Sequence, residues 1–181
     1  MEKSFKPNEP VVHPKHGLGC IGGMEEREID GELARFLTVE FPRTTLTLSI
    51  PEAKLRQSGL RRLSSASRMR TALSRLPAPP EAPEGHWSRH ATGYEEKLNS
   101  GRPELLAEIV RDLSQRGRSG AATRLYREAL LRLAEELAII EGITLDEAQA
   151  AIEARIPADP DGGRPSRQRA RAAAPEESGA S

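Results

Sequence analysis

In the first 60 residues, apolar and polar side chains alternate in short runs, which predicts β-strands. Within residues 46–50, Leu or Ile alternates with Thr or Ser, so one face of that strand should be buried. Asp30-Gly31 separates two strand-like runs and is a dipeptide that tight hairpin turns prefer. Four or five short strands with glycines at the bends predict a small, strongly curved barrel of the SH3 or Tudor kind. A barrel of that size is too small for a deep catalytic cleft.

Beyond residue 63 the apolar positions recur every three or four residues, which predicts five helices. Ser64 or Ser65 can cap the first helix, and the proline-rich stretch 77–83 should end it and form an extended spacer. Thr144 and Glu147 form a capping box for the last helix. The positions expected to face inward are Met69, Leu73, Leu76, Trp87, Ala91, Tyr94, Leu98, Leu105, Leu106, Ile109, Val110, Leu113, Leu125, Ala129, Leu133, Leu137, Ile140, Ala148, Ile152 and Ile156.

The chain should end in a tail without regular structure. Pro157 stops the last helix, and residues 158–181 are mostly Pro, Gly, Ala, Arg and Glu without periodicity, so we expect them to be disordered. The predicted fold class is therefore α+β. A small SH3/Tudor-like β-barrel comes first, and a compact all-α helical domain and a disordered C-terminal tail follow.

The composition indicates the cellular compartment of the protein but not its binding partner. The chain has 27 basic and 27 acidic residues, so its bulk electrostatics indicate no partner. Cys20 is the single cysteine, which rules out an internal disulfide and fits a reducing cytosol. The N-terminus has no apolar run like that of a signal peptide, and no stretch approaches the roughly 18 apolar residues of a membrane span. We therefore expect a cytoplasmic protein without a membrane partner.

One cluster of side chains raises the question of a metal. His13, His16 and Cys20 lie close together in the sequence, but structural zinc takes four ligands, and His86 and His90 lie beyond the spacer. The alternative is a turn that happens to hold polar residues. No P-loop, nucleophile elbow or dinucleotide-binding glycine pattern is present in the sequence, so we expect neither an enzyme nor a cofactor.

The distribution of charge is more informative than its sum. Between residues 54 and 75 every charged side chain is basic, which is the pattern of a phosphate-contacting surface or of a solvated helix face. These residues are Lys54, Arg56, Arg61, Arg62, Arg68, Arg70 and Arg75. Residues 24–32 cluster acidic side chains around Arg27 and Ile29, as on an exposed ridge.

Trp87, the only tryptophan, allows two interpretations. It lies on the apolar stripe of a helix, where a large side chain is normally buried. It also lies in the first turn after a spacer, beside Arg89 and His90, and an apolar side chain next to basic residues can wedge between base steps in a minor groove. Periodicity does not choose between the two.

Taken in order, the motifs of this chain resemble those of the CarD/CdnL family of bacterial RNA polymerase-binding transcription regulators. The matching stretches are "F…VVHPKHGLGCI", "REIDGE", "IP" followed by "GLRRL", "HWSRH", "LNSG", "AEIVRDL" and "EELAIIEGITLDEA". The resemblance covers roughly residues 5–156 and implies a Tudor-like polymerase-interacting domain in residues 1–62 and a helical DNA-binding domain in residues 63–156. Residues 157–181 are left as the disordered tail that the composition predicts.

The resemblance also implies two sets of contact residues. In the family, the N-terminal module docks on the polymerase β subunit, and here the matching positions are Arg27, Ile29, Leu48, Ser49 and Ile50. The helical module contacts the minor groove at the edge of the melted promoter bubble, through a tryptophan matched by Trp87. With the basic run included, the DNA-contacting residues are expected to be Trp87, Arg89, His90, Arg124, Arg68 and Arg70. The implied function is stabilisation of the promoter open complex by a monomer associated with the nucleoid.

Some positions depart from the family pattern. Basic or aromatic residues usual after the tryptophan are replaced by Ala91 and Thr92, a usual basic residue before the long helix by Thr123, and a larger or basic strand residue by Ser49. The alternative is therefore a diverged paralogue that binds polymerase or another protein with little DNA engagement. Which promoters respond, whether the effect is activation or repression, and the role of the tail stay open.

Overall fold

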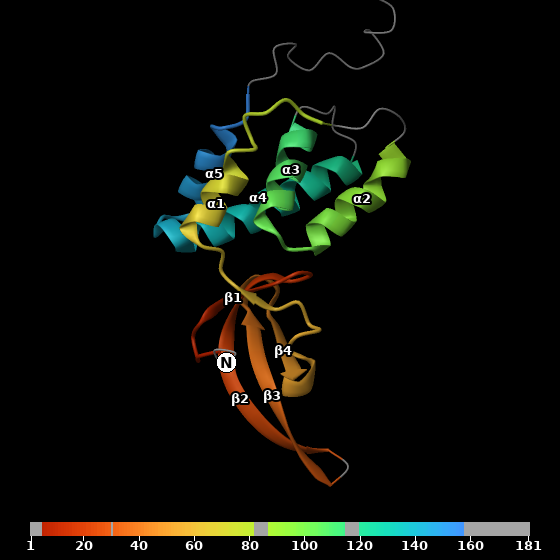
Figure 1. Ribbon diagram of the computed structural model, residues 1–181, viewed down its shortest axis with the longest axis vertical. Coiled ribbons are helices and arrows are strands. Elements are labelled where there is room, and N and C mark those ends of the chain that lie inside the picture. Colours follow the sequence, from red (N-terminus) through yellow and green to blue (C-terminus); the bar gives the residue numbers. More distant parts are fainter. Residues whose placement is uncertain (1–4, 30, 82–86, 115–119, 158–181) are drawn as a thin grey trace, which may run out of the picture.

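The computed structural model describes residues 5–29, 31–81, 87–114 and 120–157, and of Trp87, Ser88 and Arg89 it describes the backbone alone. In these ranges an antiparallel sheet comes first and a group of helices follows. The sheet and the group of helices lie one after the other along the long axis of the molecule (Figure 1). This arrangement confirms the predicted α+β fold class. We call residues 5–62 the β module and residues 66–156 the helical module. The tail predicted to be disordered, 158–181, lies outside the described residues.

The elements follow one another simply along the described chain. The strands are β1 (Pro10–His13), β2 (Gly17–Ile29), β3 (Glu32–Phe41), β4 (Leu46–Pro51) and β5 (Arg61–Arg62). Two short 3-10 turns, η1 (Pro42–Thr44) and η2 (Glu52–Lys54), flank β4. The helices are α1 (Ala66–Leu73), α2 (Trp87–Asn99), α3 (Pro103–Ser114), α4 (Gly120–Glu141) and α5 (Leu145–Glu153).

The strands pair in the order β4-β3-β2-β1-β5, which leaves β4 and β5 at the two edges of the sheet. β2 and β3 are joined by two residues, as the Asp30-Gly31 signal predicts, because Ile29 pairs with Glu32. Asp30 lies outside the described residues, and Gly31 has a φ of +82°, a conformation that favours glycine.

Two strands are longer than the short strands expected from the sequence. β2 has 13 residues and β3 has 10, and their register shifts between Ile21 and Gly23. A β-bulge of this kind bends the strand and increases its twist, so the hairpin continues past the core as a two-stranded ribbon (Figure 1). Residues 24–29 of the ribbon are exposed. The strand-like runs that the sequence shows on both sides of Asp30-Gly31 include these residues, although a ribbon exposed on both faces has no apolar period.

Each module has its own hydrophobic core. In the β module the buried side chains come from four strands and include Ile50, and Leu46 and Leu48 pack against them as the alternation in 46–50 predicts. In the helical module α4 packs on each of the other four helices, and its inward positions Leu125, Leu133 and Leu137 are buried. Burial of one such leucine contributes about 1.5–3 kcal/mol.

The helix ends largely follow their sequence signals. The Ser65 side chain accepts a hydrogen bond from the backbone N–H of Arg68, and Thr144 and Glu147 form the predicted capping box. The last helix ends at Glu153, earlier than the predicted end near Ile156. Pro157 disfavours a helical conformation at the residue before it, and Ile156 still packs on the core from the turn that follows α5.

Candidate functional site

Arg27 and Ser49, two residues of the predicted polymerase contact, meet on one face of the β module. The Arg27 guanidinium donates to Ser49 Oγ at 3.2 Å and to Glu25 Oε2 at 2.6 Å, and it lies 5.4 Å from the ring centre of Phe36. The hydrogen bond from Arg27 lowers the pKa of the Glu25 carboxyl. Half of the Arg27 side chain stays exposed. The guanidinium is thus held in place while part of it still faces solvent.

The other three residues of that prediction divide between two faces. Ile29 follows Arg27 by two positions on the same strand, lies on the same face and is exposed near the hairpin tip. Ile50 is buried in the core and Leu48 is partly buried against it. Because both side chains point inward, neither is presented to a partner, and a contact along this strand falls to the main chain at other positions of β4.

The main chain of β4 offers such a contact. Phe36 pairs with Pro51, and Pro51 has no N–H, so this pair cannot be one that exchanges hydrogen bonds. In an antiparallel ladder the two pair types alternate. Ser49 and Thr47 are therefore also non-bonded positions, and their N–H and C=O groups point away from β3, toward the free edge. An added strand would bind there.

The contact between the two modules, which we call the junction, is built from ion pairs centred on α4. Glu136 is almost fully buried and accepts two hydrogen bonds from the Arg61 guanidinium, at 2.7 and 2.8 Å, and one from the backbone N–H of Ser64 at 2.7 Å. Arg61 also donates to the carbonyl of Gly101 at 2.6 Å. These bonds tie the last strand and the first linker residues to the helical module.

A second group of ion pairs completes the junction. Arg132 of α4 donates to the main-chain carbonyls of Pro14 and Lys15 at 2.8 and 2.9 Å, and to Glu128 at 2.8 Å. Glu128 also receives two hydrogen bonds from Arg43, which lies within 3.5 Å of Glu135. Together with the Glu136 group, these contacts join the β1–β2 turn, η1 and β5 to α4 and hold the two modules in one orientation.

The junction should make stability depend on pH. The Arg43 and Arg132 guanidiniums lower the pKa of Glu128 to about 2. A depressed carboxyl pKa stabilises the fold fully above its ordinary value and loses that contribution as the pH falls toward the folded value. We expect Glu128→Gln to cost about 1–2 kcal/mol at pH 7, with the difference from wild type shrinking between about pH 4.5 and 2. Urea unfolding at pH 7, 4 and 3 measures this.

Glu135 provides the matched control, because its pKa shifts the other way. Burial raises the pKa of the Glu135 carboxyl, and no described residue donates a hydrogen bond to its buried Oε2. Neutralising it removes a desolvation penalty, so Glu135→Gln should be neutral or slightly stabilising at pH 7. Equal losses in the two variants at pH 7 would contradict this description of the junction.

The basic run 54–75 is less free in space than its sequence indicates. Arg62 pairs with Glu9, Arg68 with Glu104 and Arg75 with Glu108, in addition to the pairing of Arg61 in the junction. Sequence reasoning missed these acids because they lie 33 to 75 residues away along the chain. Arg70 is exposed and forms no ion pair within the described residues.

Only some of the residues expected to contact the minor groove have side chains among the described residues. Trp87 is the first residue of α2, and the side chains of Trp87 and Arg89 lie outside the described part of the structure. Tyr94 and Leu98, on the same predicted stripe, are buried, and His90 is partly buried. Arg124 near the start of α4 is largely exposed and lies 3.4 Å from Glu95 of α2. The ion pair brings the start of α4 beside α2.

The three residues that raised a zinc site do not converge. His13 pairs with Gly17 at one end of the β1–β2 ladder and Cys20 pairs with Pro10 at the other, three residues or about 10 Å along the strand. The His13 and His16 rings stack 4.8 Å apart against Phe41, and His13 Nδ1 accepts a hydrogen bond from the backbone of Lys15. These two histidines therefore pack and hydrogen-bond within the β1–β2 turn, next to the junction.

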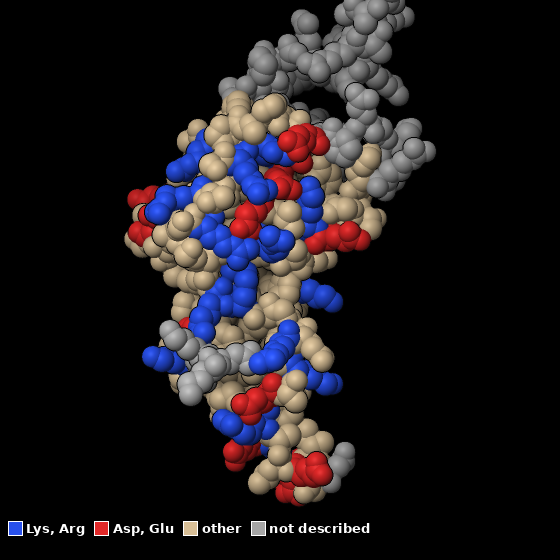
Figure 2. Space-filling model, viewed as in Figure 1, with Lys and Arg blue, Asp and Glu red and all other residues tan. Residues whose placement is uncertain are grey.

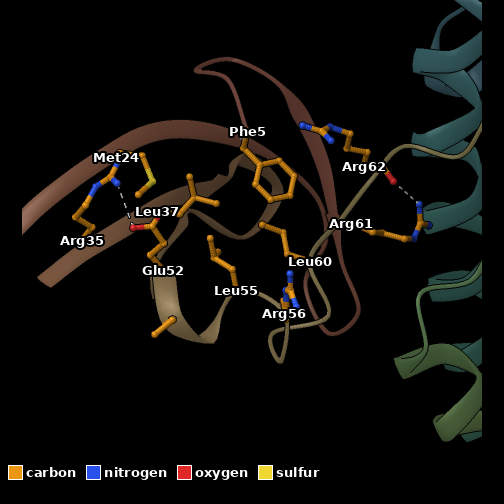
Figure 3. A pocket seen from close by; sticks show the side chains of 11 residues that line it. Phe5, Met24, Arg35, Leu37, Glu52, Leu55, Arg56, Leu60, Arg61 and Arg62 are labelled. Atoms are coloured by element: carbon orange, nitrogen blue, oxygen red, sulfur yellow. Dashed lines mark hydrogen bonds and ion pairs between the residues drawn. The ribbon is translucent and has the colours of Figure 1, made fainter. Parts of the chain in front are cut away.

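A groove of about 720 Å³ opens on the β module between the ribbon and η2 (Figure 3). Leu37, Leu55 and Leu60 line its apolar part. Three of the four arginines that line it are paired with carboxylates, Arg35 with Glu52, Arg61 with Glu136 and Arg62 with Glu9.

Across the described ranges, none of the helices is both long enough and apolar enough to cross a membrane.

Two protein families match this chain. Residues 5–64 match the CarD-like/TRCF RID domain, and residues 71–153 match the CarD C-terminal domain, so that together the matches cover more than half of the chain. The chain is also 24% identical over 144 residues to "Putative transcription factor YdeB" of Bacillus subtilis (strain 168). That alignment covers 77% of this chain and 94% of the relative.

Proposed function

Because this protein belongs to the CarD family, we propose that it is a transcription regulator that binds the RNA polymerase β subunit and stabilises the promoter open complex. In this proposal the β module holds the polymerase and the helical module contacts promoter DNA at the edge of the melted region. The protein acts as a monomer at the nucleoid and performs no catalysis.

The polymerase contact is assigned to the free edge of β4 and to the face that carries Arg27. The outward main-chain groups of Thr47 and Ser49 can pair with an edge strand of the partner, which is a common mode of protein recognition. Arg27, already oriented by Ser49 and Glu25, and the exposed Ile29 supply side-chain contacts beside that edge.

The DNA contact is assigned to the start of α2 and α4. Trp87 is proposed to wedge into the minor groove, with Arg89, His90 and Arg124 near phosphates, and Arg68 and Arg70 adding contacts from α1. Minor-groove readout is degenerate, so sequence specificity should be low. A wedge that prefers kinked, opened DNA shifts the equilibrium toward the open complex by that difference in affinity alone.

The observation that carries this proposal is that one chain holds both CarD modules, joined by a partly buried ion-pair junction. Polymerase docking raises the local concentration of a weak DNA-binding module. A junction that fixes the orientation of the modules also directs that DNA-binding module toward one place on the promoter. Neither module would have this effect alone.

The lifetime of an open complex tests the proposal. With bacterial RNA polymerase on a ribosomal-type promoter at fixed salt, the wild-type protein should lengthen the lifetime by about tenfold, since stacking of an aromatic side chain on bases contributes about 1–3 kcal/mol. Trp87→Ala should remove most of this effect, and Trp87→Phe should keep part of it. Circular dichroism of both variants checks that the helices are intact.

One outcome would favour the second candidate function, a paralogue that binds polymerase with little DNA engagement. Thr92 is exposed and Thr123 is partly exposed where the family carries basic residues, and Arg124 shares its charge with Glu95. If the wild-type protein binds polymerase and leaves the lifetime unchanged, the open-complex proposal is wrong and this candidate takes its place.

A further inference from the structure

We propose that the side of the helical module formed by α1, α3 and the end of α2 is a second surface for the phosphates of duplex DNA, distinct from the minor-groove contact at Trp87. We call it the α3 face and define it by Arg68, Arg70, Arg75, Lys97, Arg102, Glu104 and Glu108. The inference rests on the proposed function: it extends the α1 contacts assigned there to Arg68 and Arg70 into a separate phosphate-binding surface, and it adds a role for two carboxylates.

Two glutamates on α3 organise this face. Glu104 and Glu108 are four residues apart and so lie on the same side of the helix, one turn from each other. Glu104 accepts two hydrogen bonds from Arg68 of α1, at 2.6 and 3.0 Å, and lies 3.9 Å from Arg102 in the α2–α3 turn. Glu104 therefore lies between a cation of α1 and a cation from the region of α2.

Glu108 repeats this arrangement one turn further along. It pairs with Arg75 in the turn that follows α1, and its other oxygen lies 3.1 Å from the Lys97 ammonium of α2. The next turn carries Arg111, whose charge is met by Asp112 and Glu81, and there the pattern ends.

The cations lie outside and the carboxylates beneath them. The side chains of Arg68, Arg75, Lys97 and Arg102 are between 35% and 59% exposed, against 14% and 18% for Glu104 and Glu108. Including the exposed Arg70, five positive charges face two negative ones, which leaves an excess of three. Figure 2 shows Lys and Arg side chains gathered over this part of the helical module, with acidic side chains set among them.

This arrangement is suited to binding the phosphates of a polyanion without recognising its sequence. A guanidinium has five N–H donors, and Arg68 uses two groups, Nε and Nη2, on Glu104, so Nη1 remains for a phosphate oxygen. The carboxylates hold the long arginine side chains in one geometry, which reduces the entropy lost when phosphate binds. They also repel phosphate. The Arg68 hydrogen bonds lower the pKa of Glu104, so this repulsion is present at neutral pH.

The proposal therefore predicts that removing acidic charge strengthens DNA binding. Binding of the full-length protein to a fluorescent duplex of mixed sequence is measured by anisotropy at several salt concentrations. Glu104→Gln with Glu108→Gln should tighten binding about three- to tenfold and steepen the salt dependence, because more phosphate contact releases more counterions. Arg70→Gln should weaken binding about threefold and reduce the salt slope by about 1.

A matched control removes two negative charges elsewhere on the helical module. Glu141 and Glu153 are exposed, on α4 and α5, and Glu141→Gln with Glu153→Gln should change affinity by less than about twofold. The proposal is overturned if the folded Glu104→Gln/Glu108→Gln protein binds no tighter than this control. Should that variant fail to fold, Arg70→Gln and Arg102→Gln decide, and unchanged affinity and salt slope in both would overturn the proposal.

Failure of the proposed function gives a different result. If the wild-type protein binds no duplex at low salt and leaves open-complex lifetime unchanged, both proposals fail. If the lifetime depends on Trp87 while the α3-face variants bind duplex like wild type, the α3 face alone is excluded.

Discussion

Substitution of Ser49 by proline should weaken binding to bacterial core RNA polymerase by at least about tenfold, whereas Ser49→Ala should weaken it only two- to threefold. Both variants lose the hydroxyl that accepts a hydrogen bond from Arg27. Proline alone also removes the outward N–H at position 49. An unmade hydrogen bond that leaves the partner's carbonyl unsatisfied costs about 1–3 kcal/mol, and the proline ring obstructs the approach of an added strand.

The position of Ser49 makes this comparison informative. Its N–H points away from β3, so proline there breaks no hydrogen bond of the sheet, and proline is tolerated in edge strands in that orientation. The melting temperatures of the two variants should therefore be similar, while their affinities, measured by biolayer interferometry, differ. Equal affinities for Ser49→Pro and Ser49→Ala would show that the β4 main chain does not contact the polymerase.

The features that sequence predicted well depend on near neighbours. The hairpin at 30–31, the alternation in 46–50 and the capping box at Thr144 and Glu147 each rest on residues a few positions apart. Their backbone preferences and hydrogen bonds are local, so the chain specifies them before any tertiary contact forms. The same holds for the apolar stripes of the helices, whose period sets which face is buried.

The features that sequence missed depend on distant partners. Nothing in the run 54–75 indicates that Arg68 and Arg75 meet Glu104 and Glu108, because charge pairing in space has no period along the chain. One feature of the sequence does indicate a buried ion pair. Glu136 lies on the inward stripe of α4 between Leu133 and Leu137, and a carboxylate there needs a buried partner. The identity of that partner, Arg61, follows only once the two modules are placed together.

Replacing Glu136 with alanine should uncouple the two modules. The Arg61 side chain is 22% exposed and Glu136 only 2%, so removing the carboxylate leaves a largely buried cation without its counter-ion and the N–H of Ser64 without its acceptor. Breaking a buried ion pair in this way costs about 3–5 kcal/mol. Because each module keeps its own hydrophobic core, we expect the loss to fall on the junction. The radius of gyration from small-angle scattering should increase while helical content is preserved.

Uncoupling should separate the two binding steps that the proposed function joins. Polymerase affinity of Glu136→Ala should stay within about twofold of wild type, because β4 and Arg27 are untouched, whereas the lengthening of open-complex lifetime should be largely lost, since the DNA-binding module is no longer directed to one place. Glu141→Ala, an exposed glutamate on the same helix, should behave like wild type in both assays. Replacing both partners with methionine should restore compactness and part of the lifetime effect, because an apolar pair can substitute for a buried ion pair. If Glu136→Ala keeps the scattering profile and the lifetime effect of wild type, the junction does not set the orientation on which the proposed function depends.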